Sequence, residues 1–260
     1  SLHLRLVGVV HARTLADEVD RMGIPVLVGH HRTYSPLLDA AMSFLGTERF
    51  GRLVAVQGSA LFYKPGHYFL DGPWRTRKGG GPILINLIHE IGLMRHFCGE
   101  IHSVFAFAGK NIRNFEVEDT VALNLEFENG ALGNFILSDT AASSKSWEMT
   151  SGENPTYPHF PLENCYHFAG TNGSLDFPSM HARSYADPAK ASWWEEFTPE
   201  VLEFTPEDPL RLQLDHFVAV LAGQARPKVS ARDGYVNMLV IEAIMRSIET
   251  RSVIDMGALS

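Results

Sequence analysis

An alternating stretch that ends in a tight turn constrains this chain more than any other part of its sequence. In residues 121–127, hydrophobic side chains alternate with smaller or polar ones, the pattern of a β-strand with one buried face. Asn129 and Gly130 follow, a pair typical of a two-residue type I′ hairpin turn. Residues 131–139 then return as the partner strand. The chain is therefore expected to build a sheet that is at least partly antiparallel.

A glycine-rich segment followed by an amphipathic helix is the second strong pattern. Residues 79–81 are glycines, and Pro82 has the fixed φ that suits the first turn of a helix. Hydrophobic residues follow at the spacing of one buried helical face, and Gly99 stands where such a helix ends. These hydrophobic positions are Leu84, Leu87, Ile88 and Ile91.

Asn86 and His89 are polar residues on this otherwise hydrophobic helix. They stand three positions apart, which makes them neighbours on one helical surface. A glycine loop lets a ligand come close to the backbone, so His89, one or two turns into the helix, can face that ligand. A core histidine with a single hydrogen bond explains the same pattern, and the helix alone does not separate the two.

Local signals place the remaining elements. The expected helices cover residues 14–23, 36–45, 209–222 and 231–250, and their capping pairs are Thr14 with Asp17, Ser35 with Pro36, and Ser230 with Asp233. The expected strands cover residues 24–28, 52–63, 101–107, 165–169 and 174–177, and residues 4–12 are a short strand or a frayed remnant. Residues 24–28 are continuously hydrophobic, as in a strand buried on both faces, and indicate the end of an α/β layer.

Two loops carry polar and aromatic residues. His30, His31 and Arg32 follow the strand expected at residues 24–28, at the carboxyl end where open α/β sheets bind ligands. An ordinary polar loop is the alternative. Residues 141–164 are irregular and too long for a simple connection, and such segments are usually functional or disordered.

Composition and charge exclude several classes of function. The 260 residues carry a net charge of -8 with acidic and basic residues intermixed, which argues against nucleic acid or an anionic membrane as a partner. No hydrophobic run reaches the roughly 20 residues that cross a bilayer. Two cysteines form no disulfide framework, and no secretory signal is recognisable, so the protein is expected in the cytoplasm.

Two further searches of the sequence find no binding motif. No metal site is expected, because the metal-binding residue types between His96 and His102 alternate across a helix end and do not converge on one ion. No glycine turn of the dinucleotide-binding type, G-x-G-x-x-G, is present.

Several segments, taken in order, resemble the Gfo/Idh/MocA family of NAD(P)-dependent oxidoreductases. They are VLVGHHRTYSP at 26–36, GPWR at 72–75, GGGPILINLIHE at 79–90, VEDT at 117–120, ENGALG at 128–133, GTNGSL at 170–175, and the closing pattern at 216–234. The resemblance implies a Rossmann domain followed by an α+β domain with a large, mostly antiparallel sheet and helices on one face. We therefore expect residues 1–31 to be the C-terminal remnant of a dinucleotide-binding domain, and residues 32–260 to be a substrate-binding and oligomerisation domain.

The resemblance also implies roles for individual residues. His89 would be the catalytic acid–base group, and Asn86 would hydrogen-bond a substrate hydroxyl. By resemblance, Arg32, Trp74 and Arg75 would face the cofactor, and His30 is expected there from its place in the same loop as Arg32. Apart from the resemblance, we expect the substrate side to include Lys64, Tyr68, Trp147 and His159. Two family features are missing: the usual lysine before the first helix falls within Gly-Val-Val at 8–10, and the usual Asp four residues before the histidine falls on Ile85.

The expected function is that of a dehydrogenase moving hydride between NAD or NADP and a sugar, polyol or related hydroxy compound. Because the dinucleotide turn is missing, this chain is expected to bind no cofactor and to be inactive alone. The alternative is a non-catalytic oligomerisation or ligand-binding module that kept the sheet and lost the chemistry. A homodimer or higher homo-oligomer is expected, with hydrophobic residues such as Phe135 and Leu137 on the sheet face opposite Val121 and Leu123.

Overall fold

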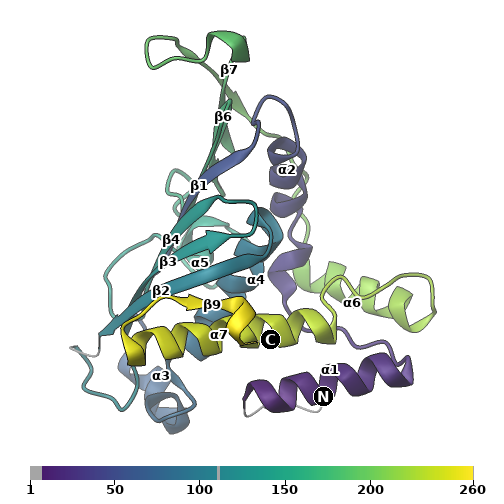
Figure 1. Ribbon diagram of the computed structural model, residues 1–260, viewed down its shortest axis with the longest axis vertical. Helices are drawn as coiled ribbons and strands as arrows, with labels where there is room; N and C mark the ends of the chain where they lie inside the picture. Colours follow the sequence, from purple (N-terminus) through teal and green to yellow (C-terminus); the bar gives the residue numbers. More distant parts are fainter. Residues whose placement is uncertain (1–7, 110–111, 260) are drawn as a thin grey trace.

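A nine-stranded sheet with helices packed against one face forms the framework of the molecule (Figure 1). The computed structural model describes residues 8–109 and 112–259. The strand order is β8-β7-β6-β5-β1-β4-β3-β2-β9; β1 and β4 run parallel, and the other neighbours are antiparallel. This confirms the expected α+β class with a large, mostly antiparallel sheet.

The element bounds are as follows. The helices are α1 (Val9–Met22), α2 (Pro36–Leu45), α3 (Gly66–Leu70), α4 (Ile88–Cys98), α5 (Trp147–Thr150), α6 (Pro209–Leu221) and α7 (Ala231–Thr250). The strands are β1 (Leu53–Leu61), β2 (Ile101–Gly109), β3 (Thr120–Phe127), β4 (Leu132–Ser138), β5 (Tyr166–Gly170), β6 (Gly173–Phe177), β7 (His181–Tyr185), β8 (Phe197–Val201) and β9 (Ile254–Asp255).

The β3–β4 hairpin is present, but its turn differs from the expected type. Only Gly130 has a positive φ, 83°, and its N–H donates to the carbonyl of Phe127 at 2.9 Å. This is a type I turn followed by a glycine bulge, not a type I′ turn. The side chain of Asn129 explains the preference, because it accepts from the N–H of Ala131 and donates to the carbonyl of Cys98 at the end of α4.

The bulge changes which residues of β4 face the core. Leu123 pairs with Phe135, so both point to the same, buried face of the sheet. A one-residue change of register moves every side chain of a strand to the opposite face. Phe135 and Leu137 therefore lie in the core, and the expectation that they form the outer face is wrong. Leu132 and Ile136 occupy that outer face instead, with 60% and 41% of their surface exposed.

The helix that carries Asn86 and His89 contains a wide turn. Residues Ile83–Leu87 are π-helical, and regular α4 begins directly after them. As expected, the helix ends at Gly99, whose φ is 90°. A π-helical turn holds one extra residue, and such turns are frequent at functional sites.

The start of the chain differs from expectation. Residues 9–12 belong to α1, so the short strand expected at residues 4–12 is wrong there, and residues 1–7 lie outside the described residues. Thr14 lies inside this helix and does not cap it; its hydroxyl donates to the carbonyl of Val10. The helix ends at Gly23 in the left-handed conformation, as expected.

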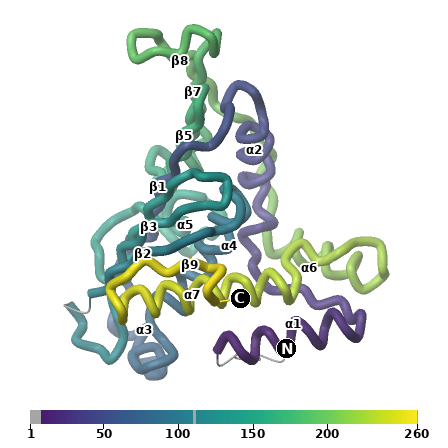
Figure 2. Tube along the Cα trace, viewed as in Figure 1, coloured from purple at the N-terminus to yellow at the C-terminus, as the bar shows by residue number. Residues whose placement is uncertain are grey.

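Residues 24–28 are not a strand in this structure. The segment runs extended, and the N–H of Val28 donates to the carbonyl of Val229 at 2.9 Å. No described strand pairs with it, so it joins no sheet, and Val26 packs instead with hydrophobic residues of α1 and α7. Beside it, α1 packs along α7 although the two are far apart in sequence, and Arg232 of α7 donates to Asp17 and Asp20 (Figure 2).

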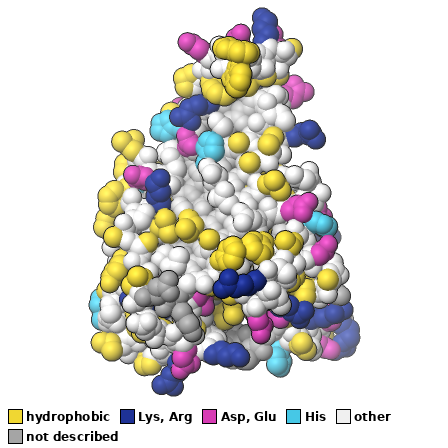
Figure 3. Space-filling model, turned by 60° about the vertical axis from the view of Figure 1, so that its left-hand side comes forward, with side chains coloured by type: hydrophobic (Ala, Val, Ile, Leu, Met, Phe, Trp, Pro, Cys, Tyr) yellow, Lys and Arg dark blue, Asp and Glu magenta, His cyan; other side chains and the backbone are white. Residues whose placement is uncertain are grey.

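The polar stretch before α6 contains two strands that the sequence patterns missed. Strands β7 and β8 form a hairpin at the sheet edge, and all of β8 is exposed, so it carries no burial periodicity. Trp193 and Trp194 are more than four-fifths exposed at its tip, where hydrophobic side chains gather at the top of the molecule (Figure 3). Within residues 8–109 and 112–259, no helix has both the length and the hydrophobicity needed to cross a bilayer.

Candidate active site

His89 is the second residue of α4 and packs against His30. The centroids of the two imidazole rings lie 4.9 Å apart. Gly92, one turn along α4, leaves room for this contact, because a Cβ there would lie 3.1 Å from His30 Nδ1. Burial, with the charge of Arg32, lowers the pKa of His89 to about 3 and that of His30 to about 4. Both rings are therefore neutral near neutral pH, and His89 is available to accept a proton.

Arg32 lies beneath the histidines in a buried cluster of charges. Its guanidinium donates to Glu90 Oε1, and Nη2 lies 2.6 Å from Glu148 Oε1. Glu90 also accepts a hydrogen bond from the hydroxyl of Tyr166. Burial alone would lower the pKa of Arg32, but the two carboxylates raise it above its usual range, so Arg32 is always charged. Arg32 therefore acts as the counter-ion of Glu90 and Glu148 in this structure.

Lys64 and Asn86 meet at the end of β1. Lys64 Nζ donates to Asn86 Oδ1 at 2.6 Å, and Asp139 Oδ2 lies 3.9 Å from the same nitrogen. Arg113 completes the group by donating to Asp139 and to the carbonyl of Lys64. Burial lowers the pKa of Lys64 to about 8, against the attraction of Asp139 and Glu148. The lysine therefore stays protonated at neutral pH, but its proton is held weakly.

Tyr68, Trp74 and Arg75 form an aromatic wall next to this group. The guanidinium of Arg75 lies 3.9 Å from the ring centroid of Tyr68 and donates a hydrogen bond to the backbone carbonyl of Tyr68. Arg75 Nε is buried and forms no hydrogen bond. Gly80 packs directly on this wall, since a Cβ there would lie 2.5 Å from the carbonyl of Trp74. The glycine triplet thus brings the helix start against the wall.

A cavity of about 360 Å³ lies between His31, the segment around α5, and the start of α6. Glu148 lines it and has one oxygen, Oε2, that is buried without a hydrogen-bond partner. Tyr157 and Asp208 form other parts of the wall. A wall with spare acceptor atoms suits a ligand that brings hydrogen-bond donors, such as hydroxyl groups.

Trp147 and His159 are placed differently from the other expected site residues. Trp147 is almost fully buried, lines the cavity, and donates from Nε1 to Glu153 at 2.9 Å. The ring of His159 lies 3.2 Å from the carbonyl of Thr150 and packs against Gly152. Trp147 therefore borders the cavity, whereas the contacts of His159 are with its own loop.

Three charged residues of the site were missed by sequence reasoning, and a fourth, Glu148, was only weakly indicated. The three are Glu90, Arg113 and Asp139. Glu148 stands in the loop that its length marked as functional, which was the one available signal. The partners of the others come from distant segments, and no local spacing reveals them. In the part of the chain that the structure describes, no three metal-binding side chains are grouped to hold a metal ion.

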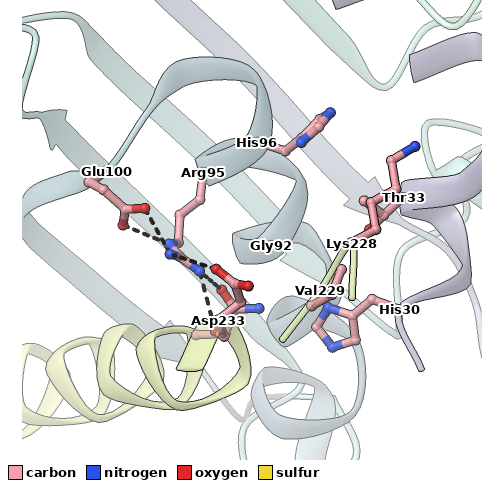
Figure 4. A pocket seen from close by; sticks show the side chains of 10 residues that line it. His30, Thr33, Gly92, Arg95, His96, Glu100, Lys228, Val229 and Asp233 are labelled. Carbon is pink, nitrogen blue, oxygen red and sulfur yellow. Dashed lines mark hydrogen bonds and ion pairs between the residues drawn. The ribbon is translucent and has the colours of Figure 1, made fainter. Parts of the chain in front are cut away.

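A smaller cavity of about 120 Å³ also borders His30 (Figure 4). Arg95 extends into it from α4, but its guanidinium is engaged by Glu100 and by Asn237 Oδ1 at 2.6 Å. Lys228, another wall residue, lies 3.5 Å from Asp39. Since its basic groups are paired within the protein, we assign this cavity no ligand.

Residues 39–176 match the family described as the GFO/IDH/MocA C-terminal domain, and because this is more than half of the 260-residue chain, the chain belongs to that family. A comparison with curated proteins found no match.

Several solved oxidoreductases have a similar fold. One is an oxidoreductase from Agrobacterium radiobacter in complex with NAD+, L-tartaric acid and magnesium, with TM-score 0.78, 15% identity, and coverage of 99% of this chain and 72% of that chain. Another is the WlbA dehydrogenase from Bordetella pertussis in complex with NADH and UDP-GlcNAcA, with TM-score 0.69, 19% identity, and coverage of 95% and 68%. A third is a levoglucosan dehydrogenase in complex with NADH and levoglucosan, with TM-score 0.72, 18% identity, and coverage of 95% and 70%.

Proposed function

We propose that this chain is the substrate-binding and oligomerisation part of an NAD(P)-dependent dehydrogenase. Its substrate would be a sugar, polyol or related hydroxy compound. One observation carries the proposal: in the fold of this family, a buried, neutral His89 follows Asn86 by three positions in one helical segment, and Asn86 accepts a hydrogen bond from Lys64. The carboxylates of Glu148, Glu153 and Asp208 in the wall of the 360 Å³ cavity support a ligand rich in hydroxyl groups.

His89 would act as the general base of the reaction. Removing a hydride from an alcohol carbon requires the hydroxyl proton to leave as well. His89 is uncharged above a pH of about 3, so at neutral pH its imidazole has a nitrogen lone pair open to that proton. His30 packs on its ring and holds its orientation. The lowered pKa values of His89 and Lys64 favour catalysis over a non-catalytic oligomerisation or ligand-binding module, because strongly shifted pKa values cluster at functional sites.

A nicotinamide cofactor, when bound, would supply the hydride acceptor. The residues of this chain that fit it are Arg75, whose buried Nε lacks an acceptor, and the neighbouring ring of Trp74. The pyrophosphate would need a glycine turn at a helix N-terminus, which the sequence does not contain. We therefore propose that binding takes place only together with a dinucleotide-binding domain.

Replacing His89 tests this function in the protein that carries both domains. Losing a general acid–base group typically lowers kcat by about 10²- to 10⁴-fold, and we expect that loss for His89→Ala in oxidation of polyols followed by NADH absorbance. His181→Ala, an exposed histidine of β7, is the matched control and should retain wild-type kcat. A loss of only a few-fold for His89→Ala would make His89 a core histidine. Failure of NADH to bind in a fluorescence titration would contradict the function as a whole.

We also propose a homo-oligomer that pairs through the outer face of the sheet. Besides Leu132 and Ile136, this face exposes half of Phe107 on β2. The register aligns Phe107, Ala122 and Ile136 in one row across three strands. Hydrophobic side chains form a band across the middle of the face seen in Figure 3. A two-fold pairing of sheet on sheet would cover them.

A further inference from the structure

We propose that Lys64 is a catalytic residue of this site, with its ammonium group donating a hydrogen bond to the substrate oxygen whose proton His89 removes. This inference rests on the proposed dehydrogenase function and assigns a second residue to the same reaction. It is carried by the position of Lys64, by the atoms that hold it, and by its unused hydrogen-bonding capacity.

The backbone holds Lys64 firmly at the end of the sheet. The N–H of Lys64 donates to the carbonyl of Asp139 at 2.9 Å, and the neighbouring Tyr63 bridges to Thr140. Only 11% of the lysine side chain is exposed. Its Nζ also lies 4.8 Å from the ring centroid of Tyr68. The ammonium group is therefore fixed in place, as a catalytic donor must be.

Asn86 links Lys64 to His89. Asn86 belongs to the π-helical turn Ile83–Leu87, and His89 follows three positions later in regular α4. Lys64 Nζ donates to Asn86 Oδ1 at 2.6 Å, so the lysine is attached to the same helical surface that carries His89. Asn86 therefore holds the ammonium group at the wide turn, three positions before His89.

Lys64 has donors to spare. An ammonium group carries three N–H donors. Among the described residues, Asn86 is the one partner within hydrogen-bond distance of Nζ, because Asp139 Oδ2 is 3.9 Å away. The remaining N–H groups can reach a ligand oxygen. In a site with little water, such a cation stabilises an oxygen on which negative charge develops.

The low basicity of His89 explains why a cation is needed here. A histidine with a pKa of about 3 is a weak base toward an alcohol. A positive charge next to the hydroxyl favours its ionised form and makes the proton easier to remove. The lysine that is usual in the family before the first helix has no counterpart in the triplet Gly8-Val9-Val10 of this chain. Val9 packs instead with hydrophobic residues of α1 and α7. Lys64 can supply the missing charge from a different element.

The reaction would balance as follows. The substrate carbon gives up its hydrogen, with the electron pair of the C–H bond, to the oxidised nicotinamide cofactor. The hydroxyl proton passes to the imidazole of His89, and a carbonyl group forms. Lys64 keeps all its protons and only stabilises the oxygen during the step, so it must be protonated to act.

Burial has the largest influence on the protonation of Lys64, and four charged residues around it modify that influence. Asp139 after β4 and Glu148 of α5 favour the ammonium form of Lys64. Burial has the largest effect and opposes it, as do Arg75 beside α3 and Arg113 before β3. The resulting pKa of about 8 predicts that kcat/KM is constant below pH 8 and falls above it.

The test is the pH dependence of kcat/KM for polyol oxidation by the protein with both domains. The variants are Lys64→Arg, which stays charged, and Lys64→Met, which keeps the length of the side chain without its charge. We expect wild-type kcat/KM to fall above about pH 8, and this fall to disappear in Lys64→Arg, which retains measurable activity. We expect Lys64→Met to lose about 10²- to 10³-fold in kcat at pH 7. Lys190→Met, on the exposed β7–β8 hairpin, is the control and should behave as wild type.

Two results would overturn the proposal. One is a fall above pH 8 that persists unchanged in Lys64→Arg. The other is a kcat for Lys64→Met within a few-fold of wild type. Circular dichroism and thermal unfolding show whether each variant is folded. If Lys64→Met does not fold, the pH dependence of kcat/KM in Lys64→Arg decides the test. If His89→Ala shows its expected loss while Lys64→Met does not, only this inference fails; if no hydroxy compound reduces NAD(P), the proposed function fails with it.

Discussion

Arg32 shows how far one residue can depend on distant parts of the chain. Family resemblance suggested that it faces a cofactor, and that role stays a prediction. The structure places it as the shared partner of Glu90 and Glu148, which are separated from it by 58 and 116 positions. Glu90 is fully buried, and burial raises the pKa of its carboxyl despite the nearby guanidinium. Without Arg32, two carboxylates would lack their counter-ion.

Arg32→Met is therefore expected to lower the free energy of unfolding by about 3–5 kcal/mol, the usual cost of removing one partner of a buried ion pair. Urea unfolding followed by circular dichroism measures the loss. Arg13→Met, on the exposed side of α1, is the matched control and should change stability by less than about 0.5 kcal/mol. Equal stability of the two variants would show that the cluster does not support the fold.

Gly58 matters at the scale of the element, because it lets two aromatic rings cross β1. A Cβ at this position would lie 2.4 Å from the ring of Phe135 and 2.9 Å from that of Tyr166. Both rings are fully buried, and Tyr166 also donates to Glu90. The parallel β1–β4 pair and the buried charge cluster thus share one close contact in the core.

Gly58→Ala is expected to destabilise the protein by about 1–3 kcal/mol, the typical cost of overpacking a well-packed core. Thermal unfolding provides the comparison. Gly66→Ala is the control, because a Cβ there meets nothing within 4 Å, and it should be neutral or slightly stabilising. If Gly58→Ala unfolds at the wild-type temperature, the rings have moved apart without cost and the close contact is not a constraint.

The outer sheet face matters at the scale of the whole molecule. Helices cover the inner face, and Leu132, Ile136 and Phe107 stay exposed on the other. We expect Leu132→Asp with Ile136→Asp to convert the proposed homo-oligomer to single chains, because a charge in a hydrophobic interface is costly to bury. Sedimentation velocity at micromolar concentration measures the mass. Leu221→Asp, an exposed position at the end of α6, is the control and should keep the mass of the wild-type protein. If the wild-type protein itself has the mass of one chain, the proposed pairing is wrong.

Local patterns predicted those parts of the fold that local energetics decide. The β3–β4 hairpin, the helix ending at Gly99, and the capping box of Ser230 with Asp233 were predicted and are present. In each, the residues that determine the conformation are close in sequence, so spacing alone carries the information. The expected hairpin turn gave a register for β4 that is one residue off. The side chains of β4 that were expected on the outer face therefore lie in the core, and the others lie outside.

The expected strand at residues 24–28 shows the limit of this reasoning. Its composition suits a strand, but a strand needs neighbours for its backbone hydrogen bonds, and this segment has no sheet partner among the described residues. The parallel pairing of β1 with β4 was not predicted for the same reason. The residue pattern of one segment predicts neither which strand pairs with it nor whether the pair is parallel or antiparallel.

By itself, the sequence determined the class of fold, the family, and the helix that carries Asn86 and His89, because periodicity, caps and ordered motifs depend on residues near one another. Only the tertiary structure decided which charges meet. Lys64 reaches Asn86 across 22 positions, and Tyr166 reaches Glu90 across 76. Such contacts exist because the sheet brings distant strand ends together and burial makes unpaired charges costly. The reactivity of the site therefore belongs to the folded chain, where burial weakens the basicity of His89 and lowers the pKa of Lys64.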